Sequence, residues 1–240
     1  MEKISILTAG DSAVTVEFAN EISPDINRRV IAFGRALAKK KIKGVLEFIP
    51  TFRSVTVSYD PCLISYGRLC KLLMRMAENT EAIGEDTKRV FYIPVCYEEA
   101  YAPDMHTVME HTGLSRQSII ELHSGRDYLI YMLGFLPGFA YLGGLDERLH
   151  TPRLATPRTK IEAGSVGIGG SQTGIYPLDS PGGWQLIGKT PVRPYEERRE
   201  NPILYRAGDY IRFVPIKEKE YQEIDMYCRA GNYHCQVKED

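Results

Sequence analysis

Two arginines stand directly behind Thr-Pro pairs at neighbouring places in the chain, at Arg153 and Arg158. Proline fixes the backbone before each arginine, and a guanidinium held in this way can bind a carboxylate through two parallel hydrogen bonds. We interpret Arg153 as the better candidate for a catalytic residue that holds an acidic substrate. A surface ion pair is the alternative for both arginines.

A glycine-rich stretch, EAGSVGIGGSQTGIYP, follows at residues 162–177. Its spacing superficially resembles that of phosphate-binding loops, but it has neither the Lys-Ser/Thr ending of a P-loop nor the strand-then-helix setting of a dinucleotide site. Glycines in strands also allow close approach of another group, so we expect a glycine-lined wall here. Gln172 and Tyr176 are then placed to project polar groups into a cleft.

Aromatic residues flank this stretch on both sides. A Pro-Gly turn in GFLPGFAYL, residues 134–142, predicts that Phe135, Phe139 and Tyr141 lie on a constrained loop. Their rings can line a pocket floor or plug one end of a barrel. In SPGGWQLIG, residues 180–188, the indole of Trp184 can stack on a ligand or pack in a core. Ser180 lacks the G-x-S-x-G elbow of a hydrolase nucleophile, so we assign it to substrate binding.

His123 lies just before DYLIYML, an apolar run at residues 127–133 that predicts a strand buried on both faces. It is the best single candidate for an acid–base group that reaches the cleft. A histidine that caps the end of its own helix is the alternative. No acidic or thiol residue completes a metal set with His106 and His111, so we expect no metal in this chain.

The elements that must position these residues fall into two groups. The first group, over about ninety residues, alternates between strand and helix periods. The pattern predicts strand, helix, strand, strand, helix, with Ser23 and Pro24 starting the first helix. This order favours a small α+β sandwich with its sheet on one side and its helices on the other.

The second group is dense in turns. Residues 134–188 hold twelve of the 21 glycines, and short strands separated by so many turns indicate a closed β-barrel or sandwich. The polar segment 79–88 predicts the boundary between the two groups. We therefore expect an α+β fold with an N-terminal domain at residues 1–85 and a β-barrel domain with the cleft at residues 86–240.

Composition excludes several classes of partner. The chain is 43% apolar and 25% charged with a formal net charge of -1, which is ordinary for a globular protein and gives no basic footprint for nucleic acid. The N-terminal residues read as an alternating strand, so we expect no signal peptide, and no apolar run reaches the ~18 residues that predict a transmembrane span. Five cysteines without a C-x-x-C pair favour free thiols and a cytoplasmic location.

Several ordered motifs together carry a family resemblance: GFLPGFAYL, the two T-P-R segments, AGSVGIGG, TGIYP and SPGGWQLIG, with GDSAVTVEF and PTFRSVTVSYDP nearer the N-terminus. The chain is similar to the allophanate hydrolase subunit 1 family, and within it to the group of 5-oxoprolinase B subunits and sporulation kinase A inhibitors. The resemblance covers nearly the whole chain and implies an α+β domain followed by a cyclophilin-like barrel.

The resemblance implies work in a complex. Members of the 5-oxoprolinase group act with subunits A and C to open the lactam of 5-oxoproline to glutamate with ATP. We expect ATP to be bound mainly by another subunit and no biotin in this chain. On this hypothesis Arg153 holds the substrate carboxylate, and Gln172, His123 or backbone N–H groups bond the lactam. The substrate-binding residues are then Phe139, Tyr141, Tyr176, Ser180 and Trp184.

Other functions stay open at this point. A regulatory module that inhibits a sensor histidine kinase needs a docking surface and no catalytic cleft. A urea- or allophanate-processing system would bring a biotin-carboxylase partner. A prolyl isomerase is a further possibility that rests on the barrel architecture alone, and architecture does not confer activity.

Overall fold

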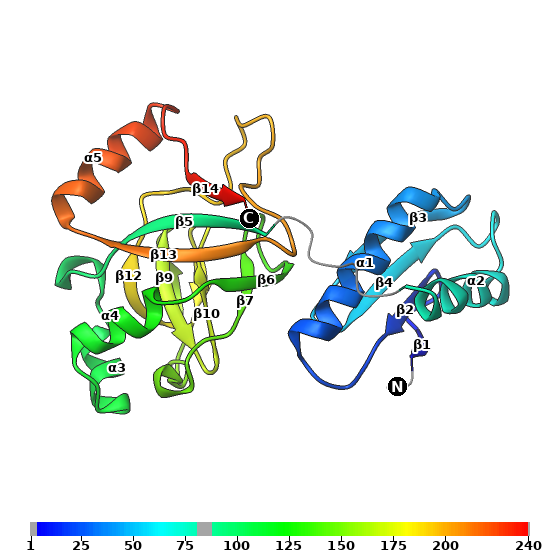
Figure 1. The fold of residues 1–240 in the computed structure, drawn as a ribbon, viewed down its shortest axis with the longest axis horizontal. Coiled ribbons are helices and arrows are strands. Elements are labelled where there is room, and N and C mark those ends of the chain that lie inside the picture. Colours follow the sequence, from blue (N-terminus) through cyan, green and yellow to red (C-terminus); the bar gives the residue numbers. More distant parts are fainter. Residues whose placement is uncertain (1–3, 81–87, 240) are drawn as a thin grey trace. The chain divides into compact units, whose positions relative to one another are not determined.

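The computed structural model describes residues 4–80 and 88–239, which form two compact units divided between residues 86 and 87 (Figure 1). The domain boundary that the sequence predicts falls among residues 81–87, outside the described residues, and stays a prediction. The combination of an α+β unit and a closed β-barrel confirms the predicted fold class.

The first unit is a four-stranded antiparallel sheet with two helices. Its strands run in the order β1-β2-β4-β3. The bounds are β1 Ser5–Thr8, β2 Ala13–Glu17, α1 Pro24–Lys40, β3 Val45–Pro50, β4 Ser54–Tyr59 and α2 Tyr66–Glu78. Alternation in β2 and β4 buries one face of each strand against apolar residues of α1 and α2, as the sequence pattern predicts.

Capping fixes where α1 begins and ends. The Ser23 hydroxyl accepts a hydrogen bond from the Ile26 N–H at 3.3 Å, and Pro24 occupies the first turn. At the other end Lys41 adopts a left-handed conformation, φ 45°, and its N–H donates to the Leu37 carbonyl. The predicted helix start at Ser23 and Pro24 is therefore confirmed.

The second unit contains the remaining described elements. They are β5 Arg89–Cys96, α3 Met105–Thr112, α4 Arg116–Ser124, β6 Tyr128–Leu133, β7 Ala140–Gly143, β8 Arg158–Ile161, β9 Ser165–Gly169, β10 Gln172–Ile175, β11 Ser180–Gly182, β12 Gln185–Lys189, β13 Tyr210–Ile216, α5 Glu218–Arg229 and β14 Gln236–Glu239. Two short 3-10 turns lie at Glu99–Tyr101 and Glu147–Leu149.

Seven of the described strands close a barrel in the order β12-β9-β10-β7-β6-β13-β5. β5 completes the circle by pairing Cys96 with Lys189 of β12, while the N-terminal half of β5 also carries β14. β13 runs parallel to β5, and the other barrel pairs are antiparallel. The helices α3 and α4 lie beside each other (Figure 1) and add Met105, Val108 and Ile119 to the barrel core.

The glycine-rich strands explain which side chains fill the barrel. Val166 and Ile168 of β9 and Ile175 of β10 belong to the interior core, and their alternating neighbours are mostly glycine. The outward side of this wall therefore has almost no side chains of its own, and other parts of the unit pack there. Among the described helices, none is both long and apolar enough to cross a bilayer.

Candidate functional site

Trp184 lies against the outer wall of the barrel, on three glycines. A Cβ added at Gly169 would sit 2.2 Å from the indole Cδ1, and one at Gly174 would sit 3.2 Å from Cζ3. A Cβ at Gly167 would meet the Trp184 Cβ at 3.2 Å. The indole is 4% exposed, so it fills the space that these glycines leave. The predicted glycine-lined wall is confirmed.

Aromatic rings surround the indole in edge-to-face contacts. Phe139 and Tyr176 lie 5.5 and 5.9 Å from Trp184 between ring centroids, and Tyr141 lies 5.2 Å from Phe139. We call Phe139, Tyr141, Tyr176 and Trp184 the aromatic cluster. Such pairs add to the free energy gained by burial. Tyr141 belongs to strand β7, so the prediction that it lies on a loop is wrong, because the chain resumes barrel pairing at Ala140.

Arg153 lies over the aromatic cluster. Its guanidinium carbon is 5.9 Å from the Trp184 ring centroid, and its Nη2 is 3.4 Å from the Gln172 Oε1. The side chain is exposed, and within the described parts of the chain no carboxylate forms an ion pair with it. An Arg on an aromatic face with open donors can bind an anion from solvent.

Arg158 has a different role, because it is already paired. Its Nη2 lies 2.6 Å from Asp104 Oδ1, and its Nη1 donates to the Trp184 carbonyl at 3.3 Å. Asp104 also accepts the Leu186 N–H at 2.6 Å and donates its own N–H to the Leu186 carbonyl. These bonds hold the start of β12, and with it Trp184, in place.

Sequence reasoning missed Asp104. A Pro-Asp pair before a helix is typical of an N-cap, and this carboxylate makes no cap hydrogen bond to α3. It is 7% exposed, and its partners Arg158 and Leu186 stand 54 and 82 residues away in sequence. A buried carboxylate needs such partners, but partners so distant in sequence cannot be predicted from the residues next to Asp104.

Two buried polar atoms near the aromatic cluster have no hydrogen-bond partner among the described residues. They are the Ser180 Oγ and the Gln185 Oε1. Ser180 pairs with Ile161, which packs in the same apolar cluster as Trp184, and the Gln185 Nε2 donates to the Pro152 carbonyl beside Arg153. Because an unpaired buried polar atom costs about 1–3 kcal/mol, both atoms are candidates for bonds to a ligand.

His123 lies inside the barrel, away from the aromatic cluster. Its Nδ1 is 2.7 Å from the Tyr97 hydroxyl and its Nε2 is 2.8 Å from the Thr173 Oγ1. Thr173 donates its hydroxyl proton to the Gly167 carbonyl, so it accepts from Nε2–H, and Nδ1 accepts from Tyr97. Burial lowers the pKa of His123 to about 3, which keeps the ring neutral.

The structure thus groups some predicted residues and separates one. Arg153 and Gln172 meet at the aromatic cluster, and Ser180 lies next to it on β11, which pairs with β8 in a two-stranded sheet. Burial raises the pKa of the Tyr176 hydroxyl, although the positive charges of Arg153 and Arg158 lower it in part. Thr173 of β10 faces the barrel interior and contacts His123, whereas its neighbour Gln172 faces outward and contacts Arg153. Strand β10 therefore separates His123 from Arg153. The catalytic assignment of His123 stays a prediction.

No group of three or more His, Cys, Asp or Glu side chains that could hold a metal ion occurs in residues 4–80 and 88–239.

Comparison with known proteins places the chain among carboxyltransferase-related sequences. A family model described as carboxyltransferase domain, subdomain C and D, matches residues 4–205. The B subunit of the 5-oxoprolinase of Bacillus subtilis (strain 168) is 41% identical over 223 residues, covering 88% of this chain and 92% of that protein. The corresponding B subunit of Escherichia coli O157:H7 is 42% identical over 219 residues, covering 91% and 99%.

A solved structure extends the likeness to the fold. The crystal structure of the Kluyveromyces lactis urea carboxylase superposes with a TM-score of 0.82 at 22% identity. The match covers 100% of this chain and 24% of that one. At this identity the likeness concerns the fold alone.

The buried His123 predicts a pH-dependent stability. Its pKa is about 3 when folded and 6.5 in an ordinary setting, so the unfolded chain binds more protons between these values. The free energy of unfolding should therefore fall as the pH drops from 6.5 toward 3, by up to about 1.4 kcal/mol per pH unit from this one group. Denaturant unfolding at a series of pH values measures this slope.

A His123→Gln variant should lose that part of the slope whatever its absolute stability. The matched control is His106→Gln, because His106 is an exposed histidine on α3. Its curve should stay parallel to that of the parent. A His123→Gln curve that also runs parallel to the parent would contradict the neutral, buried imidazole.

Proposed function

We propose that this chain, which belongs to the carboxyltransferase domain family of subdomains C and D, is the B subunit of a 5-oxoprolinase. The complex would act in the cytoplasm with subunits A and C and open 5-oxo-L-proline to L-glutamate at the expense of ATP. The observation that carries the proposal is the 41–42% identity to two 5-oxoprolinase B subunits over nearly their whole length.

The geometry around Arg153 suits this substrate. 5-Oxoproline has one carboxylate and one five-membered lactam. Arg153 can bind the carboxylate with donors that no protein carboxylate occupies, and the Gln172 amide can both donate to and accept from the lactam. The ring carbons would rest against the edges of the aromatic cluster.

The chemistry needs more than this site provides. A lactam is resonance-stabilised, and transfer of the terminal phosphoryl group of ATP to its oxygen, with release of ADP, would make the carbonyl carbon reactive. One water would then add to this carbon and the C–N bond would break, which leaves the free amine and an acyl phosphate. A second water would hydrolyse the acyl phosphate to the carboxylate of glutamate and inorganic phosphate. We assign ATP to another subunit and give this chain the task of binding and orienting the substrate.

Phe135 suggests where a partner subunit approaches. Its ring is 61% exposed and lies 5.5 Å from that of Phe139, at the edge of the aromatic cluster. Its backbone is left-handed, with φ 65°, a conformation that costs a bulky residue about 1–3 kcal/mol. An exposed aromatic ring held at such a cost suits a contact that completes the site.

A second candidate is a urea- or allophanate-processing carboxylase system. The observation in its favour is the fold shared with the Kluyveromyces lactis urea carboxylase, together with the carboxyltransferase family match. A kinase-inhibitor role stays a prediction. These candidates differ in the partner that they need, and a reconstituted assembly therefore separates them.

Co-expression with candidate A and C subunits tests the function directly. We expect glutamate release from 5-oxoproline that requires ATP and all three chains. If the assembly releases no glutamate, the proposal fails. Biotin-dependent carboxylation of urea would then support the second candidate, and tight binding to a sensor histidine kinase without turnover would support the regulator.

In the active assembly, Arg153→Gln should raise the KM for 5-oxoproline by about 10- to 100-fold, because a charged hydrogen-bond partner of the carboxylate is lost. Steady-state kinetics measure the change. Arg148→Gln is the matched control, since Arg148 is an exposed arginine paired with Asp146, which keeps Arg126 as a partner. Unchanged kinetics in Arg153→Gln would remove Arg153 from the site.

The Phe135→Gly variant should keep the stability of the isolated chain but bind its partner subunits less tightly. Glycine accepts φ 65° without strain, so the isolated chain should be at least as stable as the parent in thermal unfolding. Binding of the chain to subunits A and C should weaken, because an exposed aromatic contact is lost. Full binding and turnover in this variant would show that Phe135 contacts no partner.

A further inference from the structure

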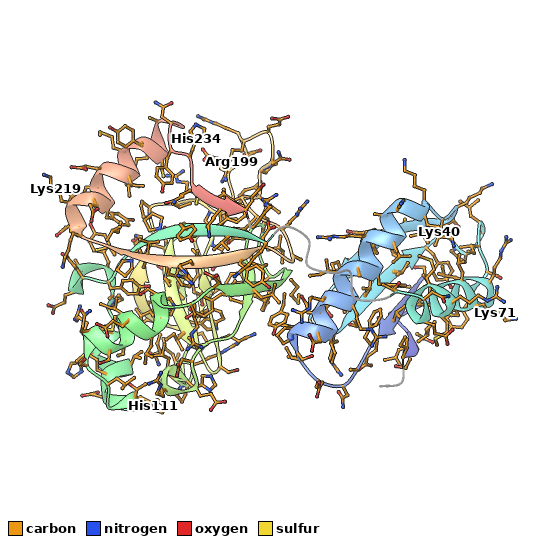
Figure 2. All side chains as sticks on the ribbon, in the orientation of Figure 1. Lys40, Lys71, His111, Arg199, Lys219 and His234 are labelled. Atoms are coloured by element: carbon orange, nitrogen blue, oxygen red, sulfur yellow. The ribbon has the colours of Figure 1, made fainter. Side chains whose placement is uncertain are left out.

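A second polar site lies elsewhere in the barrel unit. An open cavity of about 500 Å³ is lined by residues from the segment 192–204, which follows β12, and from the segment 228–235, which runs from the end of α5 toward β14. Figure 2 labels Arg199 and His234, one from each segment, and both line the cavity. The volume is in the range of small-ligand sites.

The charged groups on the cavity wall are unbalanced. Four arginines line it, Arg193, Arg198, Arg199 and Arg229, against a single carboxylate, that of Glu196. Arg199 is within 4.0 Å of Glu196, and Arg229 is paired with Asp225 at 2.7 Å. Over the described residues, the guanidiniums of Arg193 and Arg198 form no ion pair. The excess is local, since the chain as a whole has a formal net charge of -1.

The uncharged part of the wall does not offset this excess. Burial raises the pKa of Cys228 to about 11 and that of Cys235 to about 12, so both thiols are neutral at physiological pH. Burial likewise raises the pKa of Tyr233 to about 12, and its ring offers a surface for an organic group. An anion that enters the cavity therefore meets guanidinium forks and a mostly neutral lining.

We propose that this cavity binds a ligand with a diphosphate or polyphosphate group, held mainly by Arg193 and Arg198. Guanidiniums match phosphate oxygens in pairs, and two arginines without an ion pair to a described carboxylate, beside two further arginines in the same open cavity, suit a group that carries several negative charges. A monocarboxylate such as the substrate proposed for Arg153 would leave most of the excess uncompensated. The proposal does not depend on the substrate assigned to Arg153, and a nucleotide bound in this cavity would overturn the assignment of ATP to another subunit alone.

Isothermal titration calorimetry of the full chain tests it with two probes, inorganic pyrophosphate and ADP, in separate experiments. We expect saturable binding that weakens with added salt. Tighter binding of ADP would identify a nucleotide site, and equal binding would assign the affinity to the diphosphate alone. The absence of saturable binding for both probes at millimolar concentration would overturn the proposal.

Paired substitutions locate the site. The double variant R193Q/R198Q should weaken binding at least tenfold, because it removes two charged hydrogen-bond partners. The control R148Q/R206Q removes the same charge from exposed arginines outside the cavity and should leave the affinity unchanged. Equal weakening in both would reveal only a general charge effect and would overturn the assignment. Thermal unfolding of each variant checks that it is folded.

Two further measurements test whether the bound group is negatively charged and whether it must be a phosphate. Glu196→Gln should tighten binding several-fold, since it removes the one carboxylate of the wall and frees Arg199. Unchanged or weaker binding would count against the site. Citrate, a polyanion without phosphate, should bind at least tenfold more weakly than pyrophosphate, and equal affinity would contradict the choice of phosphate.

Discussion

The packing of one indole on a bare barrel wall decides the arrangement of the candidate site. Trp184 can lie flat on β9 and β10 because Gly167, Gly169 and Gly174 present no side chains there. The same strands must then supply the interior core from their other face, which they do with valine and isoleucine. One wall thus separates a packed core from an external aromatic layer, and each residue's role depends on which side it faces.

The polar groups inside the barrel wall are neutral, whereas charged groups lie on its outer side. Inside, His123 satisfies both of its nitrogens with Tyr97 and Thr173 and stays uncharged, as a fully buried imidazole must when no carboxylate faces it. Outside, the charged groups keep their charge because they are paired or solvated. Asp104, at the start of α3, pairs with Arg158 of β8 and exchanges hydrogen bonds with Leu186 of β12. These bonds fix the start of β12 directly after Trp184, and Arg153 lies over the indole with donors that no described carboxylate occupies.

Sequence patterns predicted the parts of this arrangement that depend on near neighbours. The alternation in β2 and β4, the Ser23 cap and the turn density of the barrel each reflect a local constraint, and the grouping of Arg153, Gln172 and Trp184 followed from motifs within 32 residues. The roles of Asp104 and Arg158 could not be predicted in this way, because their contacts join distant segments. His123 precedes a buried strand, but a sequence does not tell on which side of the wall its ring lies.

The composition of the site limits what this chain can do to a substrate. The aromatic cluster with Arg153 and Gln172 contains no carboxylate and no imidazole, and its hydroxyl groups belong to Tyr141 and Tyr176. Burial raises the pKa of Tyr176, so this hydroxyl is a poor base near neutral pH. Such a set can bind an anion and orient it, but it has no strong base to activate water and no strong acid to protonate a leaving nitrogen. Opening a resonance-stabilised lactam therefore requires groups from outside this cluster, which agrees with the position of the exposed Phe135 at its edge and with the assignment of the chain to a multi-subunit enzyme.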